Sequence, residues 1–155
     1  MPARTATRYE DDVYTWSQEQ ARALRRAART RVNLPEPVDF ANVAEEIESL
    51  GIAQLHALYS RYVVLLVHLL KWQHQAERRS ASWSATIRIK RREIGKLLRL
   101  SPGLKPRRSA ELVEAYAAAR EDAPAETGLP IERLPETCPY TLEQVENSTW
   151  WPDEK

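Results

Sequence analysis

Residues 68–83, HLLKWQHQAERRSASW, combine two histidines, two tryptophans, a glutamate and an Arg-Arg pair. Guanidinium groups and the free backbone N–H groups at a helix start attract negative charge, so the Arg-Arg pair and the serines that follow could bind phosphate or an acidic partner. The alternative is a structural ion-pair corner closed by this chain's own carboxylates, which we favour because acidic residues are in surplus elsewhere. The candidate residues for either role are Arg78, Arg79, Ser80, Ser82, Glu45, Glu48 and Glu77.

The two histidines of this stretch are poorly spaced for a metal ion. His68 and His74 are six positions apart, which on one helix separates them by about 120° in rotation and ~9 Å along the axis. Neither His at i and i+4 nor Glu with His at i+3 occurs. A site completed by Glu45 or Glu48 stays open, but we favour a structural histidine and expect no metal.

Three polar residues fall where the helical pattern expects burial: His68, Gln73 and Lys90. A buried ammonium must extend its aliphatic stem to reach water or meet a carboxylate. For Lys90 we favour the first arrangement, and an ion pair with Glu48 or Glu77 is the alternative.

No catalytic constellation emerges from the sequence. Cys138 precedes a short predicted helix whose N-terminus could lower the pKa of a thiol, but a small packed thiol is the simpler interpretation. Four glycines leave little material for a phosphate-binding loop, and no G-x-S-x-G or dinucleotide fingerprint appears. We therefore predict no catalytic residues and no cofactor, and an enzyme is disfavoured.

The net charge of +1 conceals a segregation of charge along the chain. Residues 68–108 carry twelve basic and two acidic side chains, whereas residues 109–155 carry three and eleven. The basic segment 78–108 could bind nucleic acid through its predicted helix, turn and helix, with Arg88, Arg91, Arg92, Lys96, Arg107 and Arg108 in place. Internal neutralisation is the favoured alternative, because the second of these helices is itself acidic.

Apolar spacing predicts helices almost throughout and no strands. The first helix should begin near Asp11 or Asp12 and end at about Arg31. The second should follow an N-cap at Asp39 and run to about Gln75, either unbroken or hinged at Gly51. Between positions 62 and 70 it is apolar on nearly every side, which is typical of a helix surrounded by others.

Three further helices are predicted. One begins at Ser80 or Ser82 and runs to about residue 100, and the next covers 107–122 until Pro124 and Gly128 end or bend it. A short helix follows Thr141 in a capping box. The sequence predicts one all-α domain over 9–152, a compact bundle of four to five principal helices with a proline-rich C-terminal wrap that buries Trp150 or Trp151, a flexible N-terminus at 1–8 and a tail at 153–155.

Location follows from two features. The lone cysteine cannot form an internal disulfide and the first fourteen residues lack the apolar core of a secretion signal, so we expect a cytoplasmic protein. The longest apolar run, at 62–70, is about half the ~20 residues that span a bilayer. No membrane segment is predicted.

Linked motifs carry a resemblance to a known family. They are VAEEIESLG at 43–51, HLLKWQHQAERRSASWSATI at 68–87, RREI at 91–94, SPGL at 101–104, and ETGLP with PETCPYT at 126–141. Together they resemble the bacterial domain-of-unknown-function family twenty-nine (DUF29) over nearly the whole chain. The resemblance implies a compact helical fold in a bacterial cytoplasm, and it implies no activity, cofactor or catalytic residue.

The biochemical function is therefore unknown from the sequence. The favoured hypothesis is a non-enzymatic protein-interaction or regulatory module with an unidentified protein partner, and a homo-oligomer is open. The alternative is a nucleic-acid- or phosphate-binding protein that uses segment 78–108, and a metal-dependent enzyme is the least favoured class.

Overall fold

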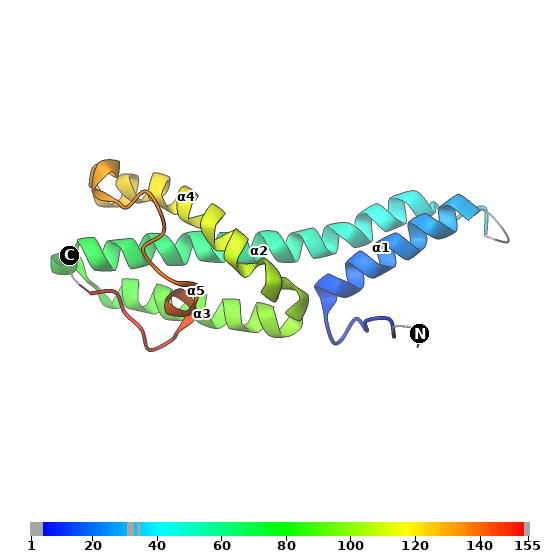
Figure 1. Cartoon of the computed structure of the whole chain (residues 1–155), viewed down its shortest axis with the longest axis horizontal. Helices are drawn as coiled ribbons and strands as arrows, with labels where there is room; N and C mark the ends of the chain where they lie inside the picture. The colour runs from blue at the N-terminus through cyan, green and yellow to red at the C-terminus, as the bar shows by residue number, and fades with distance from the viewer. Residues whose placement is uncertain (1–4, 31–32, 34, 154–155) are drawn as a thin grey trace. The chain divides into compact units, whose positions relative to one another are not determined.

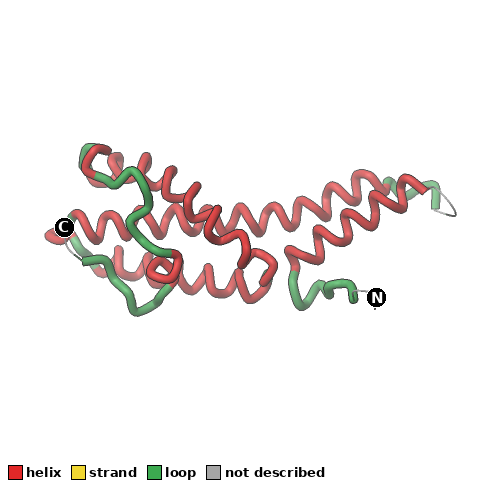
Figure 2. Tube along the Cα trace, viewed as in Figure 1, coloured by secondary structure: helices red, strands yellow, loops and turns green. Residues whose placement is uncertain are grey.

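The computed structural model describes residues 5–30, 33 and 35–153, and it contains helices and no strand within those ranges (Figures 1 and 2). Four long helices and one short helix are present there: α1 (Val13–Thr30), α2 (Phe40–His74), α3 (Ala81–Leu100), α4 (Arg108–Thr127) and α5 (Leu142–Glu146). Three 3₁₀ turns join them: η1 (Ala76–Arg78), η2 (Pro102–Arg107) and η3 (Ile131–Arg133). The all-α prediction is confirmed.

Side-chain caps begin the helices where the sequence predicted them. Asp12 Oδ1 accepts from the backbone N–H of Thr15 at 3.0 Å, and Asp39 Oδ1 accepts from that of Asn42 at 3.1 Å. Ser80, rather than Ser82, caps α3, because its Oγ accepts from the backbone N–H of Trp83 at 3.2 Å. The predicted end of the first helix, at residue 31, lies outside the described residues.

The start of α5 and the end of α4 follow equally local rules. α5 has the complete capping box, in which Thr141 and Gln144 each accept from the other's backbone N–H. Pro124 lies inside α4, which continues to Thr127 and ends at Gly128 with a φ of 72°. That left-handed conformation favours glycine and closes the helix by a bond from Gly128 N–H to the Pro124 carbonyl.

α2 is unbroken through Gly51, which settles the choice between one helix and a hinged pair. At Gly51 the backbone of α2 packs directly against α1, since a Cβ built there would lie 2.2 Å from Ser17 Oγ. Ser17, Ala21 and Ala44 are fully buried around it. Small side chains therefore bring the two helices together as an antiparallel hairpin.

Residues in contact fall into two compact units, residues 1–56 with 98–105, and residues 57–97 with 106–155. The first unit contains the α1–α2 hairpin, where Asp12 Oδ2 also accepts from the Gly103 N–H at 2.8 Å. Thr7 N–H donates to Glu19 in the same unit. The N-terminus predicted to be flexible at 1–8 and the predicted tail at 153–155 lie partly outside the described residues, and the single domain over 9–152 stays a prediction.

The second unit holds the main apolar core. The α2 residues predicted to be its centre are buried, together with apolar side chains of α3, α4 and the C-terminal segment: Tyr62, Leu65, Leu66, Leu69, Leu70, Ile87, Ile94, Leu112, Tyr116, Leu134, Tyr140 and Val145. Burying side chains of this size is the dominant favourable term in folding, so this core is the main stabilising element of the unit.

Hydrogen bonds attach the C-terminal segment to the helices of this unit. Tyr116 Oη donates to the Pro135 carbonyl at 2.6 Å, and the Trp72 and Trp151 rings lie with centroids 4.6 Å apart. Trp150 and Trp151 are half-buried.

The full length of α2 corrects one step of the sequence reasoning. That step counted only the uninterrupted apolar run, whereas the 35-residue helix is long and apolar enough to cross a membrane by length and composition. Core helices of water-soluble proteins satisfy the same two criteria, so they do not assign α2 to a membrane. The absence of a membrane segment stays a prediction.

Candidate functional site

The Arg-Arg corner is a turn of six residues, 75–80, between α2 and α3. Arg79 Nε donates to the Trp72 carbonyl at 2.8 Å, and its guanidinium lies 4.9 Å from the centre of the Trp72 ring. Arg79 is thus held against the end of α2. Arg78, Glu77 and Ser82 are exposed.

Of the carboxylates expected to close this corner, Glu48 forms an ion pair with a different arginine. Glu48 binds Arg25 of α1 at 2.6 Å, and the hydrogen bond from that guanidinium lowers the pKa of the Glu48 carboxyl. Glu45 is exposed on the same stretch of α2. The predicted pairing of Glu48 with the corner is therefore corrected, because Glu48 binds Arg25 of α1 instead. Whether Arg78 and Arg79 bind an external anion stays a prediction.

Two of the three predicted buried polar residues have partners that were not foreseen. Gln73 is buried and its Oε1 accepts from Tyr140 Oη at 2.7 Å. Lys90 is half-buried and donates to Glu93 at 2.9 Å, three residues further along α3, rather than to Glu48 or Glu77. Arg61 contacts the same Glu93 oxygen at 3.2 Å.

His68 has the features of a structural histidine. Its Nδ1 lies 2.8 Å from the Val64 carbonyl one turn earlier, which defines Nδ1 as the protonated nitrogen of the neutral ring. Burial lowers the pKa of His68. The ring borders a hollow of about 330 Å³ between α2 and α4 with Glu121, Asp122 and Glu126. No group of three or more His, Cys, Asp or Glu side chains in the described part of the chain could hold a metal ion.

Cys138 has a raised rather than a lowered thiol pKa. Burial raises the pKa, and the Sγ donates weakly to the Tyr140 carbonyl at 3.4 Å. A thiol in this state is a poor nucleophile at neutral pH. The side chain borders a partly apolar hollow of about 480 Å³ on α4.

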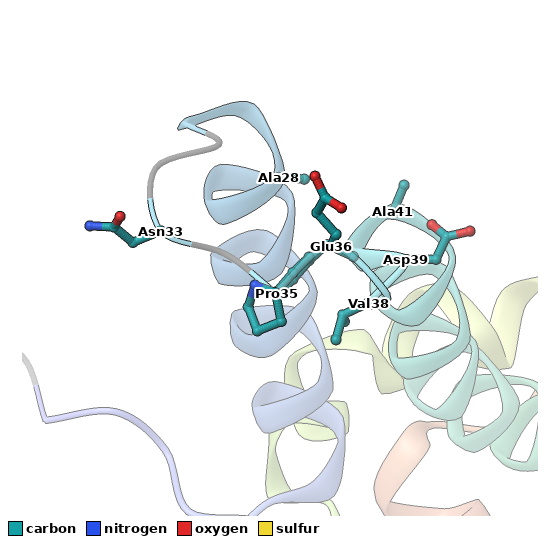
Figure 3. Close-up of a pocket in the computed structure, with 8 residues that line it drawn as sticks. Ala28, Asn33, Pro35, Glu36, Val38, Asp39 and Ala41 are labelled. Atoms are coloured by element: carbon teal, nitrogen blue, oxygen red, sulfur yellow. The ribbon is translucent and has the colours of Figure 1, made fainter.

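A further hollow of about 490 Å³ lies where α1 leads into α2 (Figure 3). Its lining is mainly from the connection and the start of α2, including Pro35, Glu36, Val38, Asp39 and Ala41. Both Asp39 oxygens are used by Asn42, at 3.1 and 2.6 Å, so this carboxylate is a helix cap. The described residues that line the hollow include no catalytic set of side chains.

The six basic residues proposed for nucleic acid separate into two groups of three. Arg91, Arg107 and Arg108 are used within the protein. Arg107 lies 3.9 Å from Glu111, and Arg108 binds Glu146 at 2.9 Å. Arg91 is 5% exposed and donates to the backbone carbonyls of Gln144, Val145 and Trp150 at 3.2, 2.8 and 2.8 Å.

The other three basic residues form one exposed face of α3. Arg88, Arg92 and Lys96 recur every four residues, which places them in a row along one side of a helix. All three are exposed, and none meets a carboxylate among the described residues. Arg88 lies 5.6 Å from the Trp151 ring centre, and Ile89 beside the row is 40% exposed. We call Arg88, Ile89, Arg92 and Lys96 the α3 surface.

A hydrogen-bond network in the second unit was missed from the sequence. Buried Tyr62 donates to Glu146, whose other oxygen accepts from Arg108. Burial raises the pKa of Tyr62 well above its ordinary value, and the Glu146 carboxylate adds to that shift. Only the capping box at Thr141 could have indicated that Glu146 ends an ordered helix, and no signal pointed to its partners.

Comparison with known proteins identifies the class and then the family. The fold is that of a solved all-α protein of unknown function from Rhodospirillum rubrum, with a TM-score of 0.68, 24% identity and coverage of 93% of this chain and 92% of that one. Residues 8–151 match the domain of unknown function DUF29, and the chain belongs to that family. The predicted resemblance is confirmed. A search of curated proteins finds no match.

Proposed function

We propose that this protein is a non-enzymatic interaction module whose α3 surface binds an acidic surface on a partner protein. The observation that supports it is the row of Arg88, Arg92 and Lys96, three exposed cations without a carboxylate partner in the described chain. Lys90, Arg91, Arg107 and Arg108 of the same segment bind groups within the protein, whereas this row leaves three cations side by side for a partner.

The composition of the α3 surface favours a protein over a nucleic acid. Arginine beside an exposed apolar side chain is typical of protein interfaces, and Ile89 lies beside the row of cations. Three cations can neutralise about three phosphates, which gives only weak, salt-sensitive binding to DNA or RNA. A complementary acidic protein surface needs no more than three carboxylates and would also cover Ile89.

Two further elements belong to the same proposal. We place the protein in the cytoplasm, where disulfides are rare, because Cys138 is the only cysteine of the sequence and has no second cysteine in the chain to pair with. The segment after Gly128 acts as a C-terminal wrap that holds α3 through Arg91, so the α3 surface is presented on a rigid support.

Binding of two labelled probes tests the proposal. A ten-residue poly-glutamate peptide and a ten-base-pair DNA duplex are each titrated with the protein by fluorescence anisotropy at several salt concentrations. We expect the peptide to bind more tightly than the duplex at equal salt, with affinity that falls as salt rises. Arg88→Glu and Lys96→Glu should each weaken peptide binding, by about fivefold or more.

The control is Arg133→Glu, a charge reversal at an exposed arginine in η3 away from the row. It should leave the affinity within about twofold, because long-range effects are screened. Equal losses in Arg133→Glu and Lys96→Glu would overturn the α3 surface as the site. Preference for the duplex would replace the protein partner with nucleic acid. Arg78→Glu shows whether the Arg-Arg corner adds to the surface.

A further inference from the structure

One cation of the α3 surface has an aromatic neighbour from the C-terminal segment. The guanidinium carbon of Arg88 lies 5.6 Å from the centre of the Trp151 ring, a distance at which a cation is attracted to the face of an aromatic ring. Arg91 lies 5.8 Å from the same ring, but its donors bind backbone carbonyls. Lys96, at the other end of the row, has no ring contact within the described part of the chain. Trp151 therefore distinguishes Arg88 from Lys96.

The Trp151 ring is itself held in place. Its centre lies 4.6 Å from the centre of the Trp72 ring at the end of α2. The backbone is fixed on both sides of it, because the Trp150 carbonyl accepts from Arg91 at 2.8 Å and the Pro152 side chain is buried. The position of the ring beside α3 is therefore set by the fold of the C-terminal segment.

A ring contact and an ion pair use different properties of a guanidinium group. The ring attracts the positive charge, whereas a carboxylate accepts from the N–H donors, of which arginine has five. Arg88 is exposed and meets no carboxylate among the described residues, so its donors are available to a partner. Ordering a long side chain during binding costs conformational entropy. A ring that restricts Arg88 before the partner arrives lowers that cost.

We propose that Trp151 is a positioning residue of the α3 surface, which holds the Arg88 guanidinium in place for a carboxylate of the acidic partner. This inference rests on the proposed function, because it assigns to Trp151 a part in binding that partner. The C-terminal segment then contributes to recognition as well as to the fold. The alternative is a purely structural tryptophan that packs against Trp72 and has no effect through Arg88.

A double-mutant cycle with the labelled poly-glutamate peptide separates these two roles. Trp151→Leu keeps an apolar side chain against Trp72 and removes the aromatic face. It should weaken peptide binding about two- to tenfold, the range for ordering one long side chain at an interface. In an Arg88→Ala background the same change should cost no more than about 1.5-fold, because the side chain that the ring positions is gone. A structural tryptophan would give the same loss in both backgrounds.

Three further variants control the cycle. In a Lys96→Ala background Trp151→Leu should keep its full effect, because Lys96 lies about 12 Å along α3 from Arg88. Trp151→Phe retains an aromatic face and should bind with an affinity between those of the wild type and Trp151→Leu. Trp16→Leu removes a tryptophan of the first unit and should bind the peptide as the wild type does. Circular dichroism of each variant checks that the helices remain.

The outcomes separate this inference from the proposed function. A wild-type protein that binds no poly-glutamate, or an affinity that Arg88→Ala and Lys96→Ala both leave unchanged, overturns the proposed function and with it the role of Trp151. If both alanine variants weaken binding, equal losses from Trp151→Leu with and without Arg88 overturn the positioning role alone. A Trp151→Leu variant that binds as tightly as the wild type also overturns that role.

Discussion

Replacing Arg91 by methionine should destabilise the protein strongly, although Arg91 is chemically identical to its exposed neighbour Arg92. The Arg91 side chain is 5% exposed and reaches three backbone carbonyls of the C-terminal segment. Methionine retains much of the aliphatic packing and removes all of the donors, so the change isolates the hydrogen bonds.

The size of the effect follows from the number of carbonyls that lose their donor. A buried acceptor left without a partner costs about 1–3 kcal/mol, less where water can enter. Three acceptors would cost about 3–9 kcal/mol, and relief of a buried charge offsets part of this, since burial already lowers the pKa of Arg91 to about 10. We expect a loss of about 3–5 kcal/mol in the free energy of unfolding.

Urea unfolding followed by tryptophan fluorescence and circular dichroism measures this loss. The matched control is Arg92→Met, one residue along the same helix, exposed and without a partner in the described chain. It should change the free energy of unfolding by no more than about 0.5 kcal/mol. Arg91→Lys should fall between the two, because an ammonium cannot reach three carbonyls as a guanidinium does. Equal midpoints for the two methionine variants would refute the structural role of Arg91.

Three further predictions concern the helix pairings. Gly51→Ala, which stabilises an ordinary helix interior, should here cost about 1–3 kcal/mol because its Cβ would meet Ser17 Oγ, and Ser17→Ala should recover most of the loss in a thermal melt. Because burial lowers the pKa of His68 below its unfolded value of about 6.5, the unfolded state takes up the proton first, so stability should fall as pH drops below 6.5 and fall less in His68→Asn. Tyr62→Phe should cost about 1–2 kcal/mol in urea unfolding by removing the bond to Glu146.

Features governed by neighbouring residues were predictable from the sequence. The caps at Asp39, Ser80 and Thr141 depend on side chains that reach the backbone two or three positions away, so the residue types alone define them. The buried stretch of α2 follows equally from the pattern of apolar residues, because a helix that is apolar on all sides needs neighbours on all sides.

The partners of the charged residues were not predictable by the same reasoning. Glu48 was expected at the Arg-Arg corner and binds Arg25, and Lys90 was expected to reach water and binds Glu93. Each of these side chains has several oppositely charged candidates in the sequence, and only the relative placement of the helices decides which one lies within 4 Å. Composition showed that acid and base could neutralise each other without showing which cations would be left over.

The cations Arg88, Arg92 and Lys96, which have no carboxylate partner in the described chain, define the proposed interaction surface. Arg91 and Arg92 are adjacent and chemically identical, but α3 turns by 100° between them. The turn places one guanidinium on the carbonyls of the C-terminal segment and the other at the surface beside Lys96. Two outcomes would contradict this division. One is an Arg92→Met variant that loses stability but keeps probe binding, and the other is an Arg91→Met variant that keeps its stability but loses probe binding. The expected outcome is that stability depends on Arg91 and binding on Arg92, measured on the same pair of proteins.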